Sequence, residues 1–207
     1  MTPFTRILLA TVAAITALAI AMIWPQSGNR GPGQSVQPPS TADIGGPFAL
    51  TDHEGNTVTD MDFRGRPLLI AFGYSKCPDV CQMMLQNISE AMDKIGDRAA
   101  GITPLFISFD PDRDTPEVLA EHLDNFHPAI RGLTGDAAAI EKVTKAYRVY
   151  YKKVEVTDPE DSAPDNYIME HSSNIYLMDR NGRYAAHFSH HTKPAEIAVA
   201  VAAAIGG

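Results

Sequence analysis

The chain has 207 residues, of which 44% are hydrophobic and 20% charged, and this balance excludes a mainly disordered protein. Its formal net charge of −8 argues against a protein that binds nucleic acid by neutralising phosphates. Two cysteines are too few for a disulfide-rich scaffold or a four-cysteine zinc finger. The length therefore fits one domain with an appendage.

The amino terminus carries an uncharged apolar run at residues 7–24, ILLATVAAITALAIAMIW. At about 1.5 Å per residue the run is about 27 Å long, close to the thickness of a bilayer core. Arg6 precedes it, so the positive-inside rule places the first residues in the cytoplasm. A cleaved signal peptide is the alternative, because residues 17–19 read Ala-Leu-Ala. The run continues to Trp24 without a polar stretch, which favours an uncleaved anchor.

The residues that follow are rich in Gly, Pro, Ser and Gln, which is typical of a flexible tether. We expect residues 1–26 to form a transmembrane anchor with a short cytoplasmic tail and residues 27–44 to form the tether. Residues 45–207 then form one folded domain in the bacterial periplasm. That compartment is oxidising, so a pair of free cysteines there requires a function.

Hydrophobic period and turn residues predict the elements of this domain. Two continuous apolar runs, PLLIAFGY and ITPLFISF, predict buried strands, and Thr115 and Asp136 are placed to cap helices. Residues 157–170 are expected to be a polar loop. In chain order we expect a hairpin (47–50 and 57–59), a strand (67–74), a helix (79–95), a strand (102–109), helices (115–126 and 136–147), a strand (150–156), a hairpin (174–178 and 184–188) and a helix (195–205).

Two strands joined through a helix predict a parallel pair with a right-handed crossover, to which the last hairpin adds antiparallel strands. The fold class expected from this order is α/β, a thioredoxin-like sandwich with an amino-terminal hairpin, preceded by one transmembrane helix.

Both cysteines lie in the segment Gly73–Cys81, GYSKCPDVC, where a predicted strand ends and a helix starts. A spacing of four places two side chains on one face of a helix, about 5–6 Å apart. That separation permits either a disulfide or a shared metal ion. A helix amino terminus stabilises thiolates, the form that binds metal and attacks disulfides. A purely structural disulfide is the alternative, but so short a loop gives little stabilisation.

His171 stands shortly before the predicted strand at 174–178, after the polar loop. In a thioredoxin-like sheet this position faces the cysteine helix. Thioredoxins place a cis-proline there, whereas this chain has no proline between Asp165 and Lys193, so a third ligand fits. Two thiolates and an imidazole suit copper, because sulfur favours Cu(I) and nitrogen keeps Cu(II) accessible. Zinc accepts the same set, so the spacing leaves the metal open.

Several other residues have both a functional and a structural interpretation. Asp79, between the cysteines, either tunes the charge of the site or is an acid that the helix dipole stabilises in a first turn. The charged loop residues Asp110, Asp112, Arg113 and Asp114 either support the site or form caps and ion pairs within their own loop. Met83 and Met84 are more typical of a core than of a copper site, and His187, His190 and His191 are more typical of a solvated loop than of a metal site.

Three separated segments resemble the Sco/SenC family of membrane-anchored copper proteins. They are Gly73–Cys81, Ser108–Glu117 (SFDPDRDTPE) and His171–Asp179 (HSSNIYLMD), in the family's order. Gln82 departs from the pattern, because members usually have proline there. The resemblance covers nearly the whole chain.

The resemblance implies a thioredoxin-like fold and a single copper bound by Cys77, Cys81 and His171. It implies a metallochaperone that helps build the binuclear copper centre of cytochrome c oxidase subunit II, rather than a turnover enzyme. The expected partners are subunit II, a periplasmic copper donor and a thiol reductant, at the bacterial inner membrane.

Two alternatives remain. One is a thiol–disulfide oxidoreductase that reduces the copper-site cysteines of the target through Cys77 and Cys81. The other is a peroxiredoxin-like peroxidase or redox sensor.

Overall fold

The computed structural model describes residues 44–156 and 166–206. The expected anchor at residues 1–26 lies outside the described residues, as does the expected tether apart from Ile44. No helix within the described ranges is long and apolar enough to cross a membrane.

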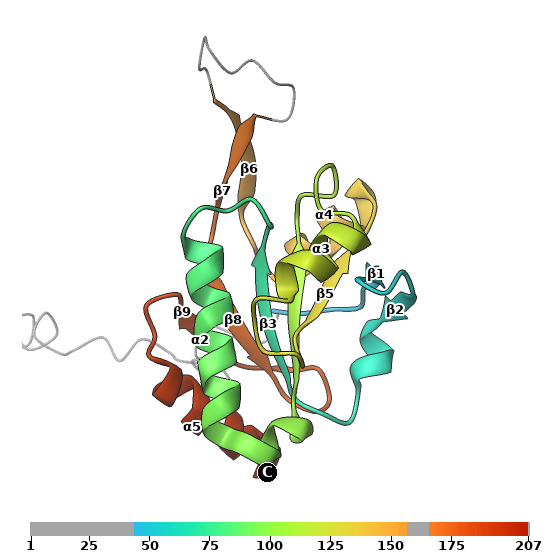
Figure 1. Ribbon diagram of the computed structural model, residues 1–207. Helices are drawn as coiled ribbons and strands as arrows, with labels where there is room; N and C mark the ends of the chain where they lie inside the picture. Colours follow the sequence, from blue (N-terminus) through green and yellow to red (C-terminus); the bar gives the residue numbers. More distant parts are fainter. Residues whose placement is uncertain (1–43, 157–165, 207) are drawn as a thin grey trace, which may run out of the picture. The chain divides into compact units, whose positions relative to one another are not determined.

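A mixed seven-stranded sheet forms the centre of the domain, with the strand order β2-β1-β5-β4-β3-β8-β9 (Figure 1). The strands are β1 (Ala49–Asp52), β2 (Thr57–Thr59), β3 (Leu68–Gly73), β4 (Thr103–Ser108), β5 (Arg131–Thr134), β8 (Asn174–Met178) and β9 (Tyr184–Ser189).

The middle of the sheet is made by β3 and β4, the two strands predicted from continuous apolar runs. They pair in parallel from Leu68 opposite Thr103 to Gly73 opposite Ser108. All six residues of β3 are buried, as expected for a strand covered on both faces. On its other side β3 pairs antiparallel with β8, which continues into β9. The predicted parallel pair and the carboxyl-terminal hairpin are therefore confirmed.

The helices begin and end close to where their capping residues predict. Thr115 accepts a hydrogen bond from the Val118 N–H, and Asp136 accepts one from the Ala139 N–H, so both predicted caps are confirmed. The helices are α2 (Val80–Ile95), α3 (Pro116–Leu123), α4 (Ala137–Ala146) and α5 (Pro194–Gly206), with 3-10 turns η2 (Asp60–Phe63) and η3 (Gly96–Gly101).

The helices cover both faces of the sheet. Phe106 of β4 contacts His122 of α3 on one face, where α2 also packs and α5 lies beside α2 (Figure 1). Phe72 of β3 points to the opposite face and contacts Tyr147 at the end of α4. Helices on both sides of a sheet with central parallel strands confirm the predicted α/β sandwich.

The structure corrects the sequence interpretation at two strands. The sequence pattern did not indicate β5, because its four residues, RGLT, form no apolar run. The polar loop predicted at 157–170 was wrong at its end, because Tyr167–His171 forms strand β7, which pairs antiparallel with β6 (Tyr151–Glu155). Only alternate residues of β7 are buried, so its apolar signal is weak. The predicted strand at 150–156 is confirmed as β6.

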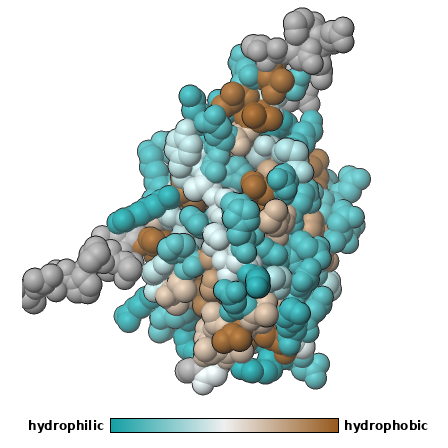
Figure 2. All heavy atoms as spheres, turned by 90° about the vertical axis from the view of Figure 1, so that its left-hand side faces the viewer, coloured by the Kyte–Doolittle hydropathy of each residue, from teal (hydrophilic) through white to brown (hydrophobic). Residues whose placement is uncertain are grey.

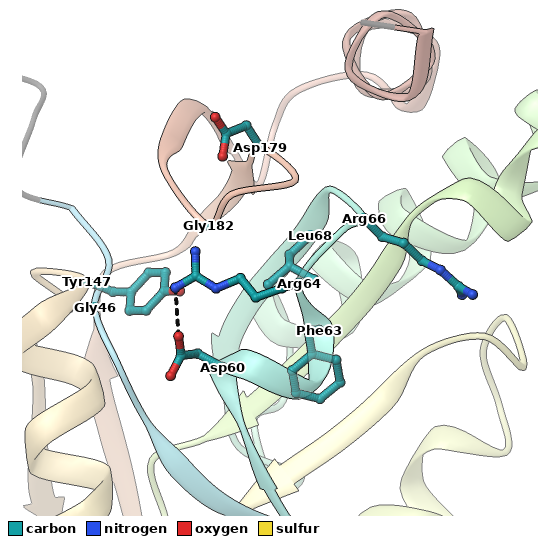
Figure 3. Close-up of a pocket in the computed structure, with 9 residues that line it drawn as sticks. All are labelled: Gly46, Asp60, Phe63, Arg64, Arg66, Leu68, Tyr147, Asp179 and Gly182. Atoms are coloured by element: carbon teal, nitrogen blue, oxygen red, sulfur yellow. Dashed lines mark hydrogen bonds and ion pairs between the residues drawn. The ribbon is translucent and has the colours of Figure 1, made fainter.

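A small pocket lies around the Arg64 side chain (Figure 3). Arg64 extends between Asp60, with which it forms an ion pair of 2.7 Å, and Gly182 of the β8–β9 turn, whereas Arg66 points away. The lining includes Tyr147 but none of the predicted site residues. The Arg64 side chain therefore connects the segment before β3 to the β8–β9 turn.

Candidate metal centre

Cys77 and Cys81 lie on either side of the start of α2. Cys77 stands in the turn before the helix, in agreement with the helix predicted to begin at residue 79, and Cys81 lies in the first turn of the helix. Pro78 accounts for this, because a residue that precedes proline is disfavoured in helical conformation. The Cys81 N–H donates a hydrogen bond to Cys77 Sγ at 3.4 Å, and the Cys77 N–H donates to the Tyr74 carbonyl at 3.2 Å. The two sulfurs therefore face one another across the first turn.

Gly73, the last residue of β3, makes room for the second cysteine. A Cβ atom at this position would lie 2.8 Å from Cys81 Sγ and 2.7 Å from the Phe106 ring. Both distances are shorter than real packing allows. The absence of a side chain at Gly73 therefore lets the buried Cys81 lie against the end of the sheet.

His171 approaches the sulfurs from β7, of which it is the last residue. Its Nε2 atom lies 3.5 Å from Cys81 Sγ and 3.9 Å from Cys77 Sγ. Its Nδ1 atom lies 3.0 Å from the Ser172 carbonyl and donates to it, so Nε2 is the ring nitrogen that faces the two sulfurs. In the described part of the chain, these three residues form the one group of at least three His, Cys, Asp or Glu ligands with ligand atoms all within 4.8 Å of one another.

Aromatic rings enclose the imidazole. The Tyr74 ring stands edge-on to His171 at 6.0 Å, and the Phe109 ring lies at 5.0 Å. Phe109 in turn stacks on Tyr151 of β6 at 5.2 Å. Because these rings belong to different elements, they hold the orientation of the imidazole against the cysteine turn.

The two thiols are electrostatically unequal. Hydrogen bonds to Cys77 from the Cys81 thiol, from His171 and from backbone N–H groups lower the pKa of Cys77 from 9.0 to about 4, although burial opposes this. The contact with Cys77, together with burial, raises the pKa of Cys81 far above its ordinary value. Burial lowers the pKa of His171, but its contacts with Cys77 and the Ser172 carbonyl outweigh burial and raise it. At neutral pH the pair thus holds one thiolate and one thiol.

The charged loop after β4 supports the site rather than forming a charged surface. Asp110 and Asp114 are buried, and the Arg113 side chain is almost so. Asp112 alone of the four side chains is largely exposed, at 77%. Asp79 is exposed at the N-cap position of α2 and makes no capping hydrogen bond with its side chain.

The two methionines lie on α2, and the three histidines near the carboxyl terminus are not part of the ligand group in the described residues. Met84 is fully buried in the core, as the sequence favours, and Met83 is half-buried. The three histidines near the carboxyl terminus do not form one cluster: His187 contacts the Tyr184 hydroxyl, whereas His190 contacts Ser173 at 2.8 Å. Only His190 and His191 are neighbours, with ring centroids 3.9 Å apart.

Sequence reasoning missed the residues that hold the two halves of the site. Tyr74 accepts a hydrogen bond from the Met169 N–H at 3.3 Å, and Tyr167 lies at the start of the strand that ends in His171. No alternation of apolar and polar residues marked this strand, because Tyr167, Ile168 and Met169 are all apolar and only the structure shows that Ile168 is exposed.

The hairpin made by β6 and β7 exposes apolar side chains next to the site. Tyr150, Val156 and Ile168 are 57%, 39% and 46% exposed. Figure 2 shows brown side chains at this end of the domain, beside the grey atoms.

Comparison with known proteins assigns the chain to a family. The model of the SCO1/SenC family matches residues 36–206. Protein sco1 of Schizosaccharomyces pombe is 40% identical over 159 residues, which are 76% of this chain and 59% of that protein. The chain thus spans less than two thirds of that relative's length.

Solved structures agree with this assignment. The structure of Bradyrhizobium japonicum ScoI with copper bound is 45% identical, with a TM-score of 0.71, over 78% of this chain and 99% of that chain. BsSco, described as a member of the Sco family of cytochrome c oxidase assembly proteins with a disulfide switch, is 21% identical, with a TM-score of 0.61, over 80% of this chain and 95% of that chain. The second likeness concerns the fold alone. On the match over residues 36–206, this chain belongs to the SCO1/SenC family.

Proposed function

We propose that this chain is a copper metallochaperone that helps build the binuclear copper centre of cytochrome c oxidase subunit II. It holds one copper through Cys77, Cys81 and His171. The observation that carries the proposal is the convergence of two sulfurs and one imidazole nitrogen within 4.8 Å. Copper is here a cargo that the chain receives and passes on.

The chemistry of the ligand set supports copper. Thiolates are soft ligands that select Cu(I), and imidazole suits Cu(II), so one site accommodates both oxidation states. Cys77 already carries a thiolate at neutral pH, so of the two cysteines Cys81 alone has to lose a proton when metal binds. The related ScoI, 45% identical, has been solved with copper bound.

For the cellular setting, we propose a single-pass anchor at residues 1–26 in the bacterial inner membrane, a tether at 27–44 and a copper-binding domain at 45–207 in the periplasm. The uncharged run at residues 7–24 supports the anchor, and Arg6 before it supports the orientation. The partners in this scheme are subunit II, a periplasmic copper donor and a thiol reductant. The membership of the SCO1/SenC family, together with the resemblance of the three sequence motifs, supports the link to the oxidase.

A second candidate function is thiol–disulfide exchange with the target, and the unequal thiols favour it. The Cys77 thiolate would attack a target disulfide, forming a mixed disulfide and releasing one target thiolate. Cys81 would then lose its proton and attack Cys77, which leaves a Cys77–Cys81 disulfide and two reduced target thiols. The two functions are compatible, because one pair of cysteines alternates between metal-bound and disulfide states.

Copper titration of the purified, fully reduced chain tests the proposal. We expect one copper per chain, with thiolate-to-Cu(II) absorption that His171→Ala weakens or alters. His187→Ala is the matched control, because His187 lies outside the site, and it should bind copper as the wild-type chain does. Absence of tight copper binding, or binding indifferent to His171→Ala, would overturn the metal site and leave thiol exchange as the function to test.

A further inference from the structure

The loop between β4 and α3 contacts the cysteine half of the site through Asp114. This carboxylate is 1% exposed, and it accepts hydrogen bonds from the Ser75 N–H at 3.0 Å, the Ser75 hydroxyl and the Ser108 hydroxyl. Ser75 lies two residues before Cys77, so these bonds fix the turn that presents Cys77. Ser108 ends β4, which pairs with Gly73 beneath the same turn.

The same loop contacts the histidine half through Asp110 and Arg113. The Arg113 guanidinium donates to the Asp110 carboxylate and, at 2.8 Å, to the Tyr167 carbonyl. The Tyr167 hydroxyl donates to Asp110, and its ring lies under the Arg113 guanidinium at 3.5 Å. Asp110 and Tyr167 are 2% and 5% exposed, so water does not compete for these contacts.

Strand β7 connects this cluster to the metal ligand. Tyr167, Met169 and His171 occupy alternate positions of β7 and therefore share one face of the strand. Tyr167 and Met169 are buried on that face, and the Met169 N–H donates to the Tyr74 hydroxyl at the end of β3. Fixing Tyr167 thus fixes the face from which His171 projects toward the sulfurs.

We infer that the loop from Ser108 to Asp114 is a bracket that sets the position of His171 relative to Cys77 and Cys81. This inference rests on the proposed copper site. Asp114 forms hydrogen bonds to the cysteine turn, and Asp110 and Arg113 form hydrogen bonds to Tyr167 of β7. All three residues belong to one loop of seven residues. These are positioning residues, because their hydrogen bonds reach the cysteine turn through Ser75 and the histidine strand through Tyr167. The bracket spans segments far apart in sequence: Ser75 and Asp114 are separated by 39 residues, and Arg113 and Tyr167 by 54.

Two conservative substitutions each remove one hydrogen bond of the bracket. Tyr167→Phe removes the hydroxyl that binds Asp110 but keeps the ring under Arg113. Ser75→Ala removes the hydroxyl that binds Asp114 but keeps the N–H bond. Tyr184→Phe is the matched control, because it removes a hydrogen-bonded tyrosine hydroxyl on β9, outside the bracket.

The first measurement is amide hydrogen exchange of the reduced, copper-free chain, which does not depend on metal binding. Tyr167→Phe should accelerate exchange in residues 167–171 and leave the cysteine turn unchanged. Ser75→Ala should accelerate exchange in residues 75–80 and leave β7 unchanged. If neither variant alters its own segment, the bracket is overturned, whether or not the chain binds copper.

The second measurement is copper affinity and the Cu(II) absorption and EPR spectra. We expect each variant to bind Cu(II) about tenfold more weakly, with altered spectra, because groups that orient ligands typically affect metal affinity by 10- to 100-fold. The melting temperature should fall by no more than about 4 °C, and Tyr184→Phe should match the wild-type chain. Wild-type affinity and spectra in both variants would overturn the inference. Failure of the wild-type chain to bind copper would instead overturn the proposed function. The amide hydrogen-exchange measurement alone would then test whether the bracket positions the cysteine turn and β7.

Discussion

The ionisation of Cys77 gives a quantitative test of the electrostatics of the site. With a pKa of about 4, Cys77 is almost wholly thiolate at pH 7, whereas an ordinary thiol with a pKa of 9.0 is about 1% ionised. Cys81 stays protonated because its pKa is raised. The ultraviolet thiolate absorbance of the reduced, metal-free chain should therefore correspond to about one thiolate at pH 7, against about 0.02 for two ordinary thiols.

The perturbation that tests the cause is Cys81→Ala, because the Cys81 thiol makes the largest contribution to the lowered pKa of Cys77. A hydrogen bond to a charged group contributes about 1.5–3 kcal/mol, and 1.36 kcal/mol corresponds to one pH unit. The substitution should thus raise the titration midpoint of Cys77 by about one to two pH units. Cys81→Ser keeps a donor at this position and should raise it less.

Spectrophotometric titration, with the fully alkylated chain as the blank, measures these midpoints. A wild-type absorbance that rises only near pH 9, or identical midpoints for the wild-type chain and Cys81→Ala, would refute the reasoning. Alkylation rate is a poorer assay, because lowering a thiol pKa from 9.0 to about 4 weakens the nucleophile about 100- to 300-fold. That loss offsets the roughly 100-fold gain in thiolate at pH 7.

Three further predictions concern stability, measured by denaturant unfolding of the copper-free chain. Gly73→Ala should lower the free energy of unfolding by about 1–3 kcal/mol, because its methyl group would lie 2.8 Å from Cys81 Sγ, and an unchanged value would contradict this packing. Thr115→Ala should cost about 1 kcal/mol through loss of the α3 cap, and Thr115→Ser should restore most of it. Burial raises the pKa of Asp52, but the hydrogen bonds from Asn56 and nearby groups outweigh burial, so the pKa is lower than its ordinary value. Because this folded-state pKa is below the unfolded value of about 3.9, its stabilisation is present above that value and is lost as the pH falls. The deficit of Asp52→Asn should thus be larger at pH 7 than at pH 3, and an equal deficit at both would count against the ionised carboxylate as its source.

The central part of the fold could be predicted because its signals are local. The apolar runs of β3 and β4 reveal buried strands without knowledge of their partners, and Thr115 and Asp136 mark helix starts through bonds to residues three positions later. The cysteine pair and His171 were found through residue type, position and motif, and the structure brings their ligand atoms together.

The elements that were missed depend on contacts between distant parts of the chain. Strand β5 has four residues and gains its place by pairing with β4 and β1. Among the described residues, strand β7 pairs only with β6, and only one of its faces is buried. It therefore does not need the continuous apolar run that marks a strand buried on both faces. The role of Asp114 follows from Ser75, 39 residues earlier, and no local pattern indicates that pairing.

The order of the ligands along the chain has a consequence for biogenesis. Cys81 precedes His171 by 90 residues, so at about 5–20 residues per second the ribosome makes the imidazole some 5–18 s after the thiols. Throughout that interval the nascent chain carries its dithiol without the third ligand, and both thiols are open to oxidation or to stray metal. The complete set of three ligands therefore exists only after strand β7 has been made, and until then the two thiols are the only part of the site that is present.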